Sequence, residues 1–218
     1  MKRMKPLLLF LCAVLLVGVS VLGTVAYLTD QAEVKNTFTV GKVEITVDEA
    51  EVNPDGTLAT PANRVTQNNY HLVPGGSYAK DPTMTVLKGS EESYVRMLVS
   101  VNCASELDAI FAAGGGFVYD SILSGFDATK WTYIGETPNA VANTVTYEFR
   151  YENAVKPTPT ENTVLEPLFT TVTIPAALDS GDMESIKDLE IVVIGHAIQK
   201  AGFNDEASAW TAFDAQMS

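Results

Sequence analysis

"YVRMLVSVNC", residues 94–103, is the stretch that decides the fold class of this chain. Apolar side chains occupy every second position: Val95, Met97, Val99, Val101 and Cys103. Because successive side chains of a β-strand point to opposite faces, this alternation predicts a strand with one buried face. Arg96 falls on the other parity, so we expect it on the polar face, where an exposed ion pair with the preceding glutamates contributes little stability.

Other segments repeat this signal. Residues 144–151 alternate in the same way through Val145, Tyr147 and Phe149, and residues 168–174 predict a further strand. Residues 189–198 are apolar on both parities, which favours a central strand covered on both faces. Shorter candidate strands occupy residues 83–88, 116–120 and 131–134.

The amino-terminal part of the predicted domain is less regular. Residues 37–49 alternate with a change of parity at Gly41, as a bulge or turn requires. Residues 49–66 contain two prolines and a Pro-Asp-Gly turn, which predict a loop or an irregular hairpin.

Two short helices are predicted among the strands. One begins at Ser105, as its N-cap, and ends at the glycines 114–116. The other begins at Asn204 or Asp205 and places Ala207, Trp210 and Phe213 on one face. Strands dominate, so the sequence predicts an all-β antiparallel sandwich with two or three short peripheral helices.

The amino terminus has the pattern of a secretory signal. Three basic residues precede an uncharged stretch over 6–29, and Thr24 and Ala26 are small residues two positions apart in a Thr-x-Ala sequence. We predict a signal peptide over residues 1–26 that is cleaved between Ala26 and Tyr27. The alternative is a retained membrane helix, because residues 6–28 are long enough to span a bilayer.

The chain is acidic. Its formal net charge is −13, and removal of residues 1–26 takes it to −16. Such a charge repels phosphate backbones, so nucleic-acid binding is disfavoured. Cys12 leaves with the signal, so Cys103 is the only remaining thiol and no intrachain disulfide can form. We predict Cys103 to be a buried small hydrophobic residue.

Catalytic and metal-binding motifs are missing from the sequence. It contains neither His-Glu-x-x-His nor Gly-x-Ser-x-Gly. His71 precedes a turn and is predicted to be exposed, whereas His196 lies in an apolar strand and is predicted to be packed and hydrogen-bonded. The acidic segments 48–56 and 178–185 lack the spacing of an EF-hand loop, so calcium binding is only weakly indicated. We therefore predict a protein that is not an enzyme and has no cofactor.

Three blocks resemble the TasA/camelysin family of proteins with a SipW-dependent signal. The first block comprises Gly23, Thr24, Ala26, Tyr27, Asn36, Thr37, Phe38 and Gly41. The second is "LVPGGSYAKDPTMTVLKGSEESYVRMLVSV" (72–101), with its Lys-Asp-Pro and Tyr-Val-Arg sequences, and the third is "AIQKAGFNDEASAW" (197–210). Residues 104–186 carry no such resemblance.

The resemblance implies a jelly-roll-like sandwich over residues 38–218, exported through a signal peptidase of the SipW type. It also implies that residues 27–37 act as a donor strand, which adds to the next subunit and builds a head-to-tail polymer. The candidate contact residues are Tyr27, Leu28, Ala32 and Val34. The segment has no proline or glycine, so it can pair along its whole length. A disordered tail, or a strand paired within its own subunit, are the alternatives.

The first functional hypothesis is a secreted structural subunit of a Gram-positive biofilm-matrix or cell-surface fibre. On this hypothesis the partners are other copies or related matrix subunits, and the membrane is met only before cleavage. The second hypothesis is a monomeric or surface-attached binding module for a glycan or a matrix protein. The third is a secreted metalloprotease of the camelysin kind, which the missing motifs disfavour.

Overall fold

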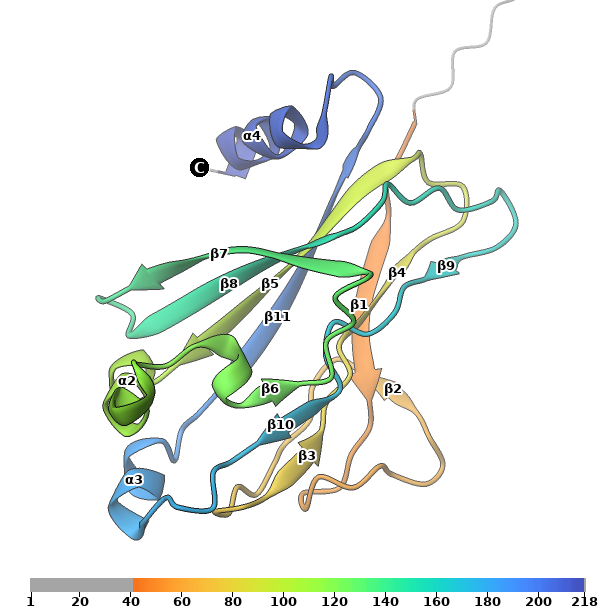
Figure 1. Ribbon diagram of the computed structural model, residues 1–218. Coiled ribbons are helices and arrows are strands. Elements are labelled where there is room, and N and C mark those ends of the chain that lie inside the picture. The colour runs from red at the N-terminus through yellow and green to blue at the C-terminus, as the bar shows by residue number, and fades with distance from the viewer. Residues whose placement is uncertain (1–40, 218) are drawn as a thin grey trace, which may run out of the picture. The chain divides into compact units, whose positions relative to one another are not determined.

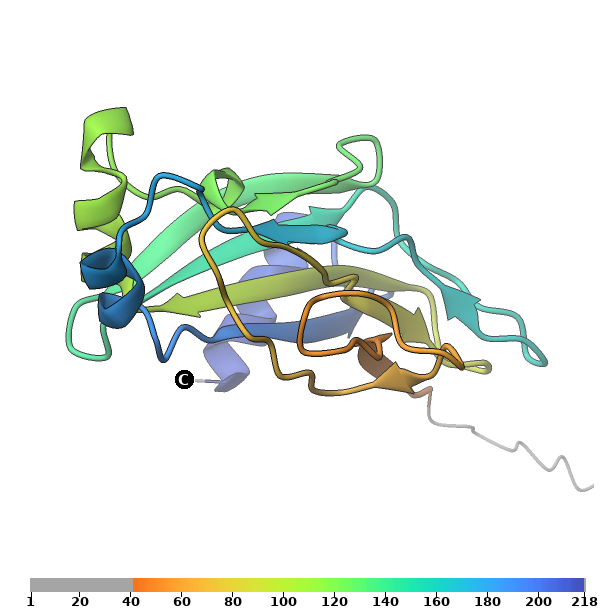
Figure 2. The same ribbon diagram turned by 90° about the horizontal axis from the view of Figure 1, so that it is seen from below.

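A computed structural model describes residues 41–217, and Figures 1 and 2 show it in two perpendicular views. The strands are β1 (Ile45–Ala50), β2 (Arg64–Val65), β3 (Ser77–Ala79), β4 (Thr83–Val86), β5 (Ser93–Asn102), β6 (Leu123–Ser124), β7 (Trp131–Asn139), β8 (Thr144–Tyr151), β9 (Thr163–Val164), β10 (Thr171–Thr173) and β11 (Ile191–Gln199). The helices are α2 (Ala104–Ile110), α3 (Ser180–Ser185) and α4 (Glu206–Met217), with 3₁₀ turns η1 (Ala112–Gly114) and η2 (Tyr119–Ser121).

The strands form three antiparallel sheets. One has the order β11-β5-β8-β7, the second β2-β1-β4-β9 and the third β3-β10-β6. The two smaller sheets face the first, and the chain crosses between the layers repeatedly, as in a jelly roll (Figure 1). The predicted all-β sandwich with short peripheral helices is confirmed.

Strand β5 lies at the centre of the fold, as its alternation predicted. Val95, Met97, Val99 and Val101 are all at most 1 % exposed. β5 pairs with β8 on one side and with β11 on the other, each without a register shift. The inward residues of β8, from Val145 to Phe149, join the same core. This apolar layer packs against Tyr78, Met84, Val86 and Val172 of the smaller sheets.

The prediction of a central strand over residues 189–198 is wrong. β11 lies at the edge of its sheet and pairs only with β5 among the described residues. Its inner residues face the core, but on its outer face Val192 and Ile194 are 40 % and 47 % exposed. Helix α4 contacts this outer face at His196, which packs on Phe213, and Val192 and Ile194 stay largely exposed.

Several local predictions also need correction. The first helix begins at Ala104, and its N-cap is Cys103 in a left-handed conformation instead of Ser105. Cys103 is consequently half-buried at the end of β5 rather than within the strand. Residues 116–120 lead into the turn η2 instead of forming a strand. The acidic segment 178–185 is largely the helix α3, which the Asp179 side chain caps.

Helix α4 forms where it was predicted. The Asp205 carboxylate caps it by accepting from the backbone N–H of Ser208 at 2.8 Å. Trp210 and Ala209 are buried against the outer face of the β11-β5-β8-β7 sheet, whereas Ala207 is exposed. Arg96 lies on this face, as predicted, but α4 covers it and leaves it only 4 % exposed, so the case of an exposed ion pair does not apply.

The irregular hairpin predicted over residues 49–66 is present. β1 continues through Ala50, an isolated bridge joins Val52 to Leu58, and β2 returns to pair with the end of β1. None of the helices within residues 41–217 has the length and apolar character needed to cross a bilayer.

Candidate functional site

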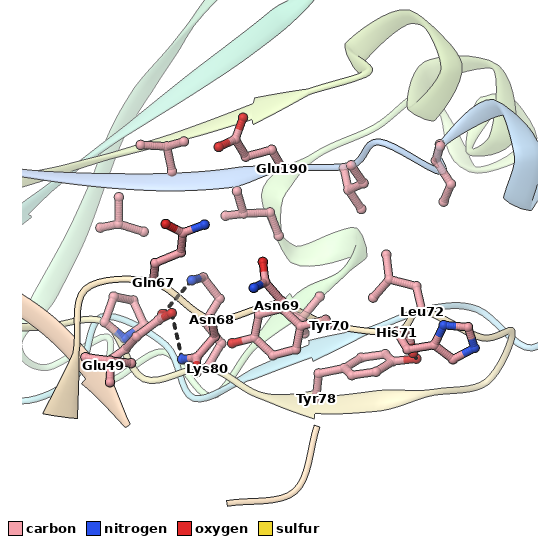
Figure 3. Close-up of a pocket in the computed structure, with 18 of the residues that line it drawn as sticks. Glu49, Gln67, Asn68, Asn69, Tyr70, His71, Leu72, Tyr78, Lys80 and Glu190 are labelled. Carbon is pink, nitrogen blue, oxygen red and sulfur yellow. Dashed lines mark hydrogen bonds and ion pairs between the residues drawn. The ribbon is translucent and has the colours of Figure 1, made fainter. Parts of the chain in front are cut away.

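A groove opens beside β11, between this edge strand and the smaller sheets (Figure 3). We call it the β11 groove. Its volume is about 810 Å³. It is lined by residues 47–49 of β1, residues 65–72, Tyr78, Lys80, Pro82, Val172, residues of α3 and its following turn, and residues 189–193. These segments are distant in sequence and meet only in the folded domain.

One wall of the groove is the open edge of β11. The backbone N–H of Lys200 donates to the carbonyl of Glu92, and the N–H of Asn102 donates to the carbonyl of Glu190. In β11, the backbone N–H and C=O groups of the even-numbered residues therefore point toward β5. Hydrogen-bonded and non-bonded pairs alternate along an antiparallel ladder. The backbone N–H and C=O groups of Ile191 and Val193 therefore point toward the groove. No backbone partner for them occurs among residues 41–217.

The opposite wall is the segment 65–72, which is held in place by one amide side chain. Asn68 donates to the carboxylate of Glu49 and to the carbonyl of Ala50, both at 2.9 Å, and accepts from the N–H of Val52 at 3.0 Å. Gln67 and Asn69, on either side, point across the gap toward β11 (Figure 3). The wall thus has a fixed backbone and offers two amide side chains to the groove.

A buried ion pair supports this wall from below. The ammonium group of Lys80 lies 2.5 Å from a carboxylate oxygen of Glu49, and both side chains are at most 10 % exposed. The next residue, Asp81, accepts from the N–H of Ala50 at 2.6 Å and binds the guanidinium of Arg64 at 2.6 Å. The Lys-Asp-Pro sequence therefore joins β1 and β2 to the chain that follows β3.

Polar and apolar side chains line the groove in about equal measure, and its charges are largely paired. Asp48 binds Arg64 at 2.7 Å, and Glu184 binds Lys187 at 2.8 Å. The Tyr70 hydroxyl donates to the carbonyl of Ala79 at 3.2 Å, and burial, then the nearby Glu49 carboxylate, raise the pKa of this phenol. The groove accordingly suits an extended, largely uncharged chain that brings its own backbone hydrogen-bonding groups.

The predicted cleavage site, Ala26 and Tyr27, and the remaining donor-strand residues Leu28, Ala32 and Val34 lie outside the described residues. They remain predictions.

The histidines and the thiol lie apart from one another. His71 is exposed at the groove rim, as predicted. His196 is packed under α4 and accepts a hydrogen bond from Arg96 at 3.2 Å, also as predicted. Burial raises the pKa of the Cys103 thiol, which disfavours the reactive thiolate. Within residues 41–217 there is no group of three histidine, cysteine or carboxylate side chains placed to hold a metal ion.

Sequence reasoning missed the groove and the Glu49–Lys80 pair. One signal was available, because Glu49 shares the parity of Ile45 and Val47 and so had to point inward with them. A buried carboxylate requires a buried partner, and Lys80 supplies it. Comparisons of the chain with family models, with curated proteins and with solved structures return no match.

Proposed function

We propose that this protein is an exported, non-enzymatic structural subunit of an extracellular fibre. In this proposal the β11 groove receives the amino-terminal segment, residues 27–37, of another copy. The observation that carries the proposal is the regular open edge of β11, which borders a groove lined by both polar and apolar side chains. An unpaired strand edge is a template for a strand from another chain.

The sequence of the donor segment fits this groove. Leu28, Ala32 and Val34 all occupy even-numbered positions, so an extended strand presents them on one face. That face would contact the apolar side chains among those that line the groove, while the backbone pairs with Ile191 and Val193. Each fully buried Leu or Val side chain contributes about 1.5–3 kcal/mol.

The proposed contact also explains why assembly would be open-ended. The donor segment and the acceptor groove are different surfaces of one chain, so the contact is heterologous and leaves one donor and one acceptor unused at the ends. Before cleavage, these residues are joined directly to the apolar segment 6–28, and in this proposal that attachment keeps them from pairing. Release between Ala26 and Tyr27 would therefore switch assembly on.

The test compares three chains by electron microscopy and sedimentation. A chain that begins at Tyr27 is expected to form fibres, and one that begins at Phe38 is expected to stay monomeric. In the third chain, Leu28→Asp and Val34→Asp place two charges on the inward face and should prevent assembly.

The matched control carries Thr29→Asp and Gln31→Asp, which add the same charge on the opposite face of the strand. It should still polymerise. If both double variants lose assembly equally, general charge repulsion explains the effect and the donor-strand proposal fails.

The amide side chains of Gln67 and Asn69 support a second candidate, a binding module that holds a polar extended ligand in the same groove. A chain beginning at Tyr27 that stays monomeric at high concentration would favour this candidate. Glycan or matrix-peptide binding that is lost in Gln67→Ala would then establish it.

A further inference from the structure

A buried cation, Arg96, makes several contacts between helix α4 and the sheet. The guanidinium of Arg96 lies over the Trp210 ring at 4.4 Å and near the Phe213 ring at 5.1 Å. It also forms an ion pair with the carboxylate of Asp214. These three partners all belong to α4, while Arg96 belongs to β5. Cation–π contacts with a desolvated guanidinium are among the stronger ones, so this contact holds the helix on the sheet.

His196 completes this cluster from β11. Its Nδ1 accepts a hydrogen bond from Nε of Arg96 at 3.2 Å, and its ring packs on Phe213 with 4.7 Å between the centroids. A guanidinium can only donate, so the contact requires an unprotonated Nδ1. The neutral form of the ring is therefore built into the docked position of α4.

The carboxylates that face His196 are already engaged. Asp214 binds two nitrogens of Arg96. Glu148 of β8 lies 2.7 Å from Arg150 and 3.6 Å from Arg96. Glu206 of α4 accepts from the indole of Trp210 at 3.0 Å and lies 4.0 Å from Arg150. A proton added to His196 would thus place a third cation beside Arg96 and Arg150, next to carboxylates that already bind these two guanidinium groups.

We propose that α4 is an acid-released latch. Protonation of His196 breaks its hydrogen bond with Arg96 and loosens the helix from the outer face of the sheet. This inference is independent of the fibre proposal, since it concerns the other face of β11.

The direction of the effect follows from linkage. Burial, and then the charge of Arg96, lower the pKa of His196 below 6.5, against the smaller opposing influence of Asp214 and Glu148. The docked helix therefore favours the neutral ring. Docking is at full strength above pH 6.5 and weakens as the pH falls from 6.5 toward the lowered pKa, by up to about tenfold per pH unit. Below that pKa no further weakening comes from this group.

The two tryptophans allow a direct measurement by ¹⁹F NMR of the protein labelled with 5-fluorotryptophan. Trp210 reports on α4, and Trp131, buried with its indole bound to the carbonyl of Glu166 at 3.0 Å, reports on the core. Between pH 7.5 and 5, the Trp210 resonance should shift or broaden while that of Trp131 stays unchanged. A Trp210 resonance that does not respond, or one that moves together with Trp131, overturns the latch.

Two substitutions make the test specific. In His196→Asn the amide oxygen replaces the acceptor Nδ1 but does not titrate, so the pH response of Trp210 should be lost. His71→Asn removes the only other histidine of the chain and should leave the response intact. His196→Gln serves the same purpose if the Asn variant shifts the Trp131 resonance at pH 7.5. A response that survives replacement of His196 rules out the proposal.

Discussion

The two edges of the β11-β5-β8-β7 sheet differ in every feature that controls strand addition. β11 pairs with β5 over nine consecutive positions without a bulge, and its only titratable residue is His196. β7 carries a register shift between Tyr133 and Gly135, an exposed glutamate at 136 and a proline at 138. Bulges, charges and prolines are the devices by which proteins protect sheet edges from pairing.

This difference indicates which edge of the sheet is available for pairing with an incoming strand. Pro138 has no N–H, so in β7 its nitrogen can only face the open side, where it offers no donor to an incoming strand. β11 has no such device, and a groove extends beside it. One sheet thus combines a protected edge with an open one, so within this sheet only the β11 edge is left to accept a strand from another chain.

The largest expected effect on assembly comes from a proline placed in the open edge. The N–H of Val193 points away from β5, so Val193→Pro should keep the ladder within the subunit while removing a donor from the groove wall. The lost donor leaves an acceptor of the inserted strand unpaired, which costs about 1–3 kcal/mol, so the critical concentration for fibres should rise by roughly fivefold to a hundredfold. Sedimentation across a concentration series measures it.

Glu136→Pro is the matched control, because it places a proline at the protected edge. This variant should assemble as the parent does. If both prolines abolish fibres while thermal unfolding remains normal, the proposed distinction between the edges is wrong.

The largest expected effect on the free energy of unfolding concerns the groove wall opposite β11. Lys80→Met leaves the Glu49 carboxylate buried without its cation, and removal of one partner of a buried pair costs about 3–5 kcal/mol. Lys187→Met breaks an exposed pair on the same groove and should leave the free energy of unfolding nearly unchanged. Urea unfolding gives both free energies. Equal losses would show that Lys80 does not hold this wall.

A smaller difference in stability is expected between alanine substitutions at two glycines, one on each edge strand. A Cβ at position 195 would overlap Met84 Cε and lie 2.6 Å from Val47 Cγ2, where β11 meets β1. Gly195→Ala should therefore destabilise the fold by about 1–3 kcal/mol, since overpacking forces neighbours to move. A Cβ at position 135 meets nothing within 4 Å, so Gly135→Ala should change stability by less than about 0.5 kcal/mol. Thermal unfolding of the two variants measures both changes, and equal losses of stability would contradict this prediction.

The smallest effect is expected from Pro138→Val. This change restores a backbone donor at the β7 edge, but the bulge and the Glu136 charge remain. Stability should change by less than about 0.5 kcal/mol, and light scattering should show no new association. A dimer formed by this variant would mean that Pro138 alone protects the edge.

The core could be predicted from the sequence because it depends on local alternation. Val95, Met97, Val99 and Val101 alternate, and the structure buries all of them. Arg96 could not be placed in this way, because its burial depends on Trp210, more than a hundred positions away. For the same reason the apolar run 189–198 suggested a central strand, although α4 and not a neighbouring strand covers part of it.

The groove could not be predicted from any single segment. Its walls come from residues 47–49, 65–72 and 189–193, and no motif in one of them indicates the others. Two sequence features belong to the site: Glu49 lies on the inward face of its strand, and Lys-Asp-Pro directly follows β3. In the sequence they are separate features, and neither indicates the other. Their meaning depends on the pairing of Glu49 with Lys80 across the domain.

The position of the groove between layers also has a consequence for heat resistance. Its walls belong to different sheets, so an inserted strand would tie the two layers together and would have to leave before they could separate. Binding to the folded state alone raises the temperature of unfolding. In a fibre, the terminal copy with an empty groove would therefore melt first, and loss of subunits on heating would proceed from that end.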